Sequence, residues 1–125
     1  MTSPVHVERT GRGPSVVLLH GWGMNGGVWE NVSASLAEQF EVHMVDLPGF
    51  GHSRESDEPE LAAWADAVAA AVPSDAVWVG WSLGGMVALA AASETESLAG
   101  LALVGTTIAW AWLLGEPYPA AFLDL

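Results

Sequence analysis

The five residues Gly80-Trp81-Ser82-Leu83-Gly84 have the G-x-S-x-G spacing that places a nucleophilic serine on a sharp turn. An apolar run typical of a buried strand, Val77 to Trp81, leads into the serine, and a helical pattern of small apolar residues runs from Leu83 to Ala92. Glycines on both sides let such a strand and helix approach closely. We therefore expect the Ser82 hydroxyl to be exposed as a nucleophile. A simple helix N-cap is the alternative.

A second motif, His20-Gly21-Trp22-Gly23, follows another apolar run, Val16 to His20. Acyl transfer from an ester needs two N–H donors around the oxygen that becomes negative in the transition state. The Leu83 amide, at the start of the helix, is one candidate, and the Trp22 amide is the other because neighbouring strands end at the same edge. Alternatively, these glycines only form a turn and Trp22 belongs to the core.

The same stretch also fits a dinucleotide-binding fingerprint. Gly21, Gly23 and Gly26 spell G-x-G-x-x-G, and Asp46 ends the next strand, where such proteins hold a ribose. Against this reading, Trp22 puts a bulky side chain where a pyrophosphate must approach the backbone, and an elaborate loop follows Asp46. It also leaves Ser82 without a purpose.

Three histidines are candidate bases for Ser82, but all precede it, whereas the acid and histidine partners of a serine on such a turn follow it in the chain. We expect His20 to support the loop after its strand, His43 to lie within a strand and His52 to lie on a surface loop. No histidine and carboxylate spacing typical of a metal site is present, so neither a metal nor another cofactor is expected.

Predicted strands and helices alternate along the chain and must position these residues. This alternation predicts an α/β fold, a three-layer sandwich with a mostly parallel sheet and helices on both faces. The predicted helical patterns are Val28 to Phe40, with Asn25 as a cap, Leu61 to Val72, and Leu83 to Ala92. The predicted strands are Val5 to Glu8 as an antiparallel edge, Val16 to His20, Val42 to Val45, Val77 to Trp81, and Leu101 to Gly105.

Composition limits the function classes. The chain has 125 residues, of which 51% are apolar, enough for one compact domain. Fifteen acidic residues against three basic ones give a net charge of -12, which argues against nucleic acids and anionic membranes as partners. The absence of cysteine excludes disulfides and thiol catalysis.

No export signal is present in the first fifteen residues, so a cytoplasmic location is expected. Residues 97–115 carry no charge and are long enough to cross a membrane, but their flanks are acidic and no Lys or Arg follows. We expect them to form a buried strand that runs into a tryptophan-rich, lid-like segment.

Taken together, His20 to Gly23, Asp46 to Ser53 and Gly80 to Gly85 resemble the α/β-hydrolase superfamily, and within it carboxylesterases of biotin biosynthesis. The resemblance covers residues 13–105. It implies that Ser82 is the nucleophile, that the amides of Trp22 and Leu83 form the oxyanion hole, and that Trp22 lines the acyl pocket. Ser82, Trp22 and Leu83 would then all contact the substrate.

The family continues into a helical lid and two strands that carry the catalytic Asp and His. We therefore expect residues 1–105 to be the N-terminal part of a hydrolase core, and residues 106–125 to be a divergent lid start or an unrelated tail. Such a truncated fold would be a weak or inactive esterase. A non-catalytic fragment or binding piece is the alternative.

The expected partner is a small ester. The resemblance also implies an acyl-carrier protein, but docking of an acidic carrier on a chain of charge -12 is unfavourable. An exposed apolar edge at Leu101 to Gly105 predicts self-association, or pairing with a complementing C-terminal half.

Overall fold

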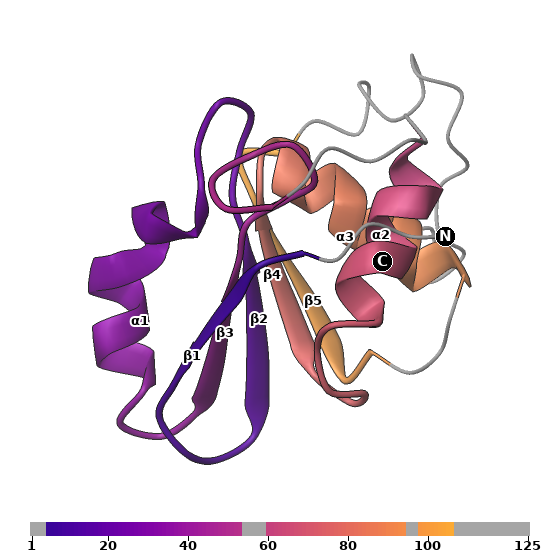
Figure 1. Ribbon diagram of the computed structural model, residues 1–125. Helices are drawn as coiled ribbons and strands as arrows, with labels where there is room; N and C mark the ends of the chain where they lie inside the picture. The colour runs from indigo at the N-terminus through magenta and orange to yellow at the C-terminus, as the bar shows by residue number, and fades with distance from the viewer. Residues whose placement is uncertain (1–4, 54–59, 95–97, 107–125) are drawn as a thin grey trace.

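The structure, a computed structural model, describes residues 5–53, 60–94 and 98–106. Within these residues, a sheet in the strand order β1-β3-β2-β4-β5 forms the middle layer (Figure 1). Only β1 is antiparallel to its neighbour, β3. The strands are β1 (Val7–Thr10), β2 (Ser15–Leu19), β3 (Glu41–Val45), β4 (Val77–Trp81) and β5 (Gly100–Val104).

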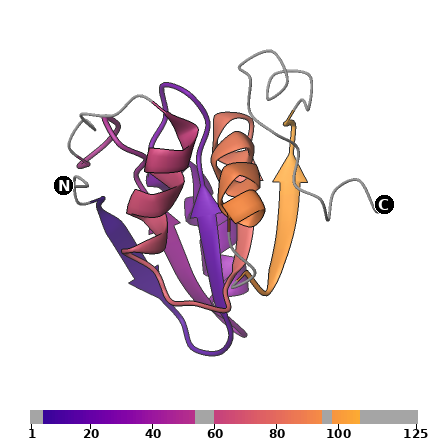
Figure 2. The ribbon, with the colours of Figure 1, turned by 90° about the vertical axis from the view of Figure 1, so that its right-hand side faces the viewer.

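Helices cover both faces of this sheet. Helix α1 lies on one face, and α2 and α3 lie side by side on the other, as the two perpendicular views show (Figures 1 and 2). The predicted three-layer α/β sandwich is therefore confirmed. The helical elements are the 3₁₀ helix η1 (Gly26–Trp29), α1 (Glu30–Leu36), α2 (Leu61–Ala69) and α3 (Leu83–Glu94).

The two strands that the sequence predicts at the centre of the sheet are neighbours there. In β2, the four residues 16–19 are at most 5% exposed, because β3 pairs with this strand on one side and β4 on the other. Parallel strands that are covered by helices on both faces have sequences that are apolar at consecutive positions. Strand β4 has the predicted bounds, and the other strands differ from the predicted bounds by at most two residues at either end.

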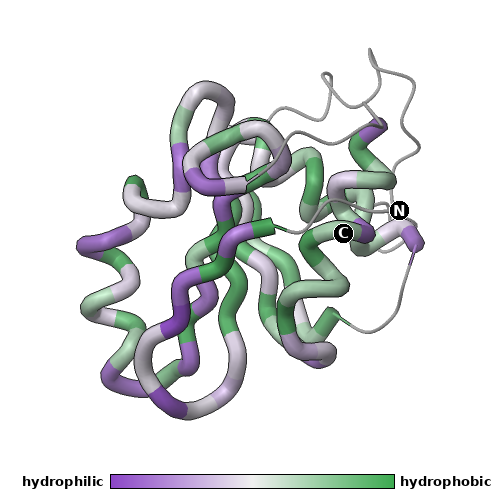
Figure 3. Tube along the Cα trace, in the orientation of Figure 1, coloured by the Kyte–Doolittle hydropathy of each residue, from purple (hydrophilic) through white to green (hydrophobic). Residues whose placement is uncertain are grey.

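Helix α3 is the most buried helix of the described part. Residues 84–91 are all buried, and the helix packs against α2, β4 and β5. Its small and apolar residues on every side predicted this position. Figure 3 shows the same contrast in colour: α3 and the central strands are mostly hydrophobic, whereas β1 is mostly hydrophilic.

In the predicted helix from Val28 to Phe40, apolar residues recur every fourth position (28, 32, 36 and 40), and the expectation that they form one buried stripe is partly wrong. Val28 and Val32 are 44% and 45% exposed, whereas Trp29 and Ser33 are the buried residues of this segment. A spacing of four residues drifts by about 40° per step around a helix of 3.6 residues per turn, so such a stripe does not stay on one face. The segment also begins as the 3₁₀ helix η1, which Asn25 caps by accepting a hydrogen bond from the Gly27 N–H at 2.9 Å.

Strand β5 lies at the edge of the sheet and pairs with β4 alone among the described residues. Its Val104 side chain is 49% exposed.

None of the helices in the described ranges combines the length and the apolar character that a membrane span requires. Apart from Thr106, the predicted second segment, 106–125, lies outside the described residues.

Candidate active site

Ser82 lies at the corner between β4 and α3. The strand ends at Trp81 and the helix begins at Leu83, so Ser82 alone makes the turn. Its φ angle is 54°, in the left-handed region that residues other than glycine rarely adopt. The residue is exposed at the carboxyl end of the parallel strands, which is the placement that the G-x-S-x-G motif predicts.

Two glycines allow the strand and helix to meet at this corner. A Cβ atom on Gly80 would overlap the backbone of Gly84 and Gly85, and a Cβ atom on Gly84 would overlap the backbone of Leu19 and His20. The start of α3 therefore touches the ends of both β4 and β2. Any larger residue at either position would push the helix away from the sheet.

The loop after β2 borders Ser82. A Cβ atom on the buried Gly21 would lie 3.6 Å from the Ser82 Cβ atom. Trp22 is 73% exposed, so the alternative that it belongs to the core is wrong. Within the described part of the chain, neither the Trp22 N–H nor the Leu83 N–H donates a hydrogen bond. Two unpaired donors thus lie on the elements that flank Ser82.

The buried His20 ring links this loop to the loop after β3. Its Nε2 atom accepts a hydrogen bond from the Leu47 N–H at 2.9 Å, and its Nδ1 atom lies 2.7 Å from the Gly21 carbonyl oxygen. Burial lowers the pKa of His20 below its ordinary value of 6.5, because desolvation disfavours the charged ring; the bond to Gly21 and the Asp46 charge oppose this effect. His20 therefore supports the loop, as expected, and is not directed at Ser82.

An aromatic cluster stands beside the loop, with the half-buried Phe50 at its centre. Phe50 makes edge-to-face contacts with Trp22, His20 and Trp64, at centroid distances of 5.1, 5.5 and 6.4 Å. Such contacts stabilise ring positions beyond the effect of buried area. Sequence reasoning missed Phe50, because its partners come from three different segments.

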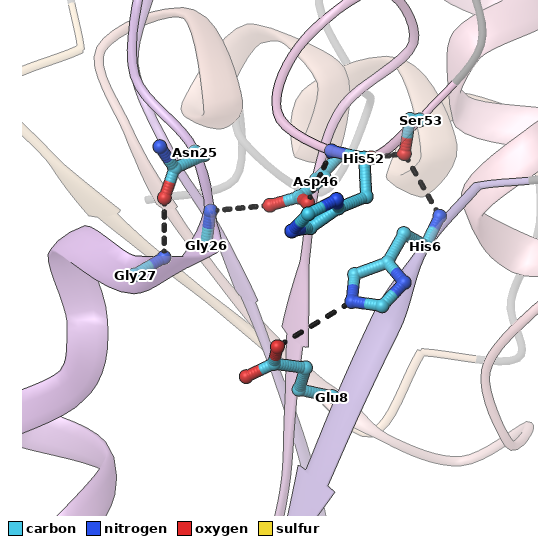
Figure 4. A network of polar contacts seen from close by, with 8 residues as sticks. All are labelled: His6, Glu8, Asn25, Gly26, Gly27, Asp46, His52 and Ser53. Carbon is cyan, nitrogen blue, oxygen red and sulfur yellow. Dashed lines mark hydrogen bonds and ion pairs between the residues drawn. The ribbon is translucent and has the colours of Figure 1, made fainter.

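Asp46 has a structural role in the described residues. Its buried carboxylate accepts hydrogen bonds from the Gly26 N–H at 2.6 Å and from the His52 N–H at 2.9 Å (Figure 4). Both oxygens are thus occupied by main-chain donors that join two loops. The carboxylate that the dinucleotide alternative assigns to a ribose is thus engaged by the main chain of the protein itself.

A cavity of about 260 Å³ opens beside this carboxylate and lies away from Ser82. It is lined by Glu8, Asn25, Gly26, Gly27, Met44, Asp46, Gly51 and His52. Figure 4 shows Asp46 and the polar residues near it, among them Ser53, whose hydroxyl accepts a hydrogen bond from the His6 N–H at 2.8 Å. No described group of three or more His, Asp or Glu residues here or elsewhere could hold a metal ion.

The other two candidate histidines lie where the sequence predicts. His43 is buried within β3 and its Nε2 atom lies 2.8 Å from a Glu41 carboxylate oxygen, while His52 is on an exposed loop and makes an edge-on contact with the His6 ring. In the ranges that the structure describes, no histidine ring hydrogen-bonds Ser82.

Comparison with known sequences relates this arrangement to one family. Residues 14–124 match the alpha/beta hydrolase fold family. Pimeloyl-[acyl-carrier protein] methyl ester esterase from Stenotrophomonas maltophilia (strain R551-3) is 48% identical over 118 residues, which cover 94% of this chain and 44% of that protein. The protein of the same name from Vibrio campbellii is 56% identical over 88 residues, 70% of this chain and 35% of that protein. The chain thus spans less than half the length of these curated relatives.

Solved structures give the same result. The chain is similar to a thermophilic esterase from Thermogutta terrifontis, with a TM-score of 0.76 and 34% identity over 82% of this chain and 40% of that one. It is also similar to the N-acyl homoserine lactonase AidH, with a TM-score of 0.78 and 26% identity over 85% of this chain and 43% of that one.

Proposed function

The chain belongs to the alpha/beta hydrolase fold family, as its motifs predicted, and we propose that it acts as a serine carboxylesterase with Ser82 as the nucleophile. One observation carries the proposal: an exposed serine with φ of 54° is flanked by two elements, each with a main-chain N–H, of Trp22 or Leu83, that donates to no acceptor in the described part of the chain. A serine so placed can reach an ester carbonyl carbon, while both N–H groups remain available to the carbonyl oxygen.

In the proposed reaction, the Ser82 Oγ atom attacks the ester carbonyl carbon and gives up its proton. The Trp22 and Leu83 N–H groups stabilise the negative oxygen of the tetrahedral intermediate. The Leu83 N–H also lies at the first turn of α3, where the helix dipole favours negative charge. The alcohol leaves with a proton, and water then attacks the acyl-serine, which releases the acid and restores the hydroxyl.

The proton acceptor is not assigned to any of these residues. No histidine follows His52 in the 125 residues, and the described histidines have their partners elsewhere. With the nucleophile and the two donors but without a base, about 10³–10⁴ over the uncatalysed rate remains. We therefore expect the 125-residue chain to acylate slowly, and to gain rate with a complementing segment that supplies an acid and a histidine.

For the substrate, we propose a small ester with an apolar acyl group. The exposed Trp22 and the Phe50 ring beside it offer an aromatic surface next to Ser82. The relatives named above act, by name, on an ester of an acyl-carrier protein. Such an acidic partner finds little complementary charge on this chain, which has three basic residues against fifteen acidic ones and a net charge of -12.

The test is incubation of the 125-residue chain with p-nitrophenyl butyrate, followed by intact-mass measurement and peptide mapping. A butyryl group on Ser82 is expected, absent in Ser82→Ala and retained in Ser74→Ala, an exposed serine remote from the site. A folded chain that is never acylated at Ser82 contradicts the proposal and favours a non-catalytic binding role. Turnover at an ordinary esterase rate, abolished by Ser82→Ala, would reveal a base within the chain.

A further inference from the structure

We propose that His20 is a positioning residue: its imidazole holds the peptide plane between Gly21 and Trp22 and thereby aims the Trp22 N–H at the oxygen of the bound ester. This inference rests on the proposed function, in which that N–H is one half of the oxyanion hole. The buried His20 ring does not itself touch the substrate. It orients the Trp22 N–H, which does.

The two contacts of the ring fix its protonation. The Leu47 main-chain N–H can only donate, so the His20 Nε2 atom that accepts from it at 2.9 Å carries no proton. In the neutral ring the proton is therefore on Nδ1, which donates to the Gly21 carbonyl at 2.7 Å. The ring is completely buried and packs against Phe50, so it has no room to turn over.

The geometry of the peptide bond transmits this contact. No cis peptide bond is present in the described residues, and a trans peptide unit is planar with its C=O and N–H on opposite sides. The Gly21 carbonyl receives two donors, His20 Nδ1 and the Met24 N–H, the latter at 3.3 Å. With the carbonyl held from one side, the Trp22 N–H of the same unit must point to the other.

The held peptide unit borders the nucleophile. Gly21 is the residue whose added Cβ atom would lie 3.6 Å from the Ser82 Cβ atom, and no described acceptor takes the Trp22 N–H. Gly23 next in the loop has a positive φ of 74°, and no atom lies within 4 Å of its Cβ position. The plane is therefore held by the Met24 N–H, by the Trp22 ring on Phe50 and by the His20 ring, which among the described residues is the side chain that bonds the Gly21 carbonyl.

Two substitutions test the hydrogen bonds of the two ring nitrogens one at a time. An Asn side chain can place its NH₂ group where Nδ1 donates, and a Gln side chain can place its oxygen where Nε2 accepts. His20→Asn therefore keeps the contact to Gly21, and His20→Gln keeps the contact to Leu47. Both lose one buried hydrogen bond, so a purely structural role predicts similar losses of stability and reactivity.

Acylation of Ser82 by p-nitrophenyl butyrate is the first readout, with urea unfolding measured alongside. His20→Asn should stay within about threefold of the native acylation rate, the effect of a fraction of one hydrogen bond. His20→Gln should lose about 10²-fold, the effect of one misdirected oxyanion donor. Equal rates for the two variants, or a faster rate for His20→Gln, would overturn the assignment.

Nuclear magnetic resonance of the native chain gives a readout that needs neither activity nor a folded variant. The His20 ¹⁵N shifts should show a protonated Nδ1, and the Trp22 N–H residual dipolar coupling should match a single fixed peptide plane. An averaged coupling, or a proton on Nε2, would contradict the proposal even if Ser82 is acylated. If Ser82 is not acylated, the esterase proposal fails, while these two measurements still decide whether His20 holds the plane.

Discussion

The Thr106 hydroxyl donates a hydrogen bond to the Ser82 carbonyl at 3.1 Å, so the chain just beyond β5 holds the residue that follows β4. Ser82 in turn donates its N–H to the Val104 carbonyl at 2.9 Å. Both main-chain polar groups of a residue in left-handed conformation are thereby anchored to the neighbouring strand. Strained backbone persists only where its surroundings fix it in this way.

Replacing Thr106 tests this anchor. Thr106→Val keeps the shape but loses the hydroxyl donor, and should lower the free energy of unfolding by about 0.5–1 kcal/mol, since the bond is exposed. Thr106→Ser keeps the donor and should stay close to the native value. Urea unfolding followed by tryptophan fluorescence measures both, and an equal loss in the two variants would show that the hydroxyl has no such role.

The strain at Ser82 predicts a trade between stability and reactivity. Ser82→Gly removes the Cβ atom that disfavours a φ of 54°, and should raise the free energy of unfolding by about 0.5–1 kcal/mol while abolishing acylation. Asp75, with a φ of 61° in a turn remote from the site, is the matched control. Asp75→Gly should stabilise the chain by a similar amount and leave acylation unchanged. If Ser82→Gly lowers the free energy of unfolding, the backbone at Ser82 is not strained.

Close approach of strand and helix makes Gly80 irreplaceable. Gly80→Ala forces a methyl group into the backbone of Gly84 and Gly85, which should cost about 2–3 kcal/mol of unfolding free energy. Gly100→Ala, in β5, meets only Val77 side-chain carbons at 3.4 Å or more and should change stability by less than about 0.5 kcal/mol. Thermal or urea unfolding compares the two, and similar losses would show that the corner tolerates expansion.

The lowered pKa of His20 predicts how stability depends on pH. Below pH 6.5 the unfolded chain protonates this ring more readily than the folded chain does, so the unfolded state binds more protons. The contribution of neutral His20 to the free energy of unfolding is therefore complete above pH 6.5, and it is lost as the pH falls through the lowered pKa of the ring. His20→Asn should flatten the unfolding free energy in this window, as urea unfolding on both sides of pH 6.5 will measure. If the unfolding free energy of His20→Asn depends on pH as steeply as that of the native chain, other groups cause the dependence.

Among the described residues, the outer edge of β5 has no pairing strand, which predicts self-association of the 125-residue chain. An unpaired strand edge with apolar side chains is a template for pairing with a second strand. Size-exclusion chromatography should show a concentration-dependent shift to larger species, which Val104→Lys should reduce. Val28→Lys places the same charge at an equally exposed valine on η1 and should leave the shift unchanged. A native chain that elutes as a monomer at all concentrations would rule this out.

Local patterns in the sequence were enough to predict the strand, the turn at Ser82 and the helix that follows it. Each is encoded within a few consecutive residues: a β-branched run, two glycines and small helical residues. The same holds for the buried strand before His20 and for the three-layer order of the fold. The predicted family is confirmed by the match of residues 14–124 to the alpha/beta hydrolase fold family.

Contacts between distant segments could not be predicted in the same way. Phe50 acquires its role from rings on three other segments, and Thr106 acquires its role from the carbonyl of Ser82, which lies on a distant turn. Val28 looked like a core residue because spacing alone does not show which side of a helix meets the sheet. These properties arise only when the tertiary structure brings the partners together.

The Val104 carbonyl and the Thr106 hydroxyl hold the main chain of Ser82, whereas the rings beside it come from two loops and from helix α2. If Ser82 is the nucleophile, as we propose, the rings at positions 22, 50 and 64 can be exchanged, and the preferred acyl group with them, without moving the serine. Relatives that share these anchors would then diverge in substrate preference through the aromatic side chains.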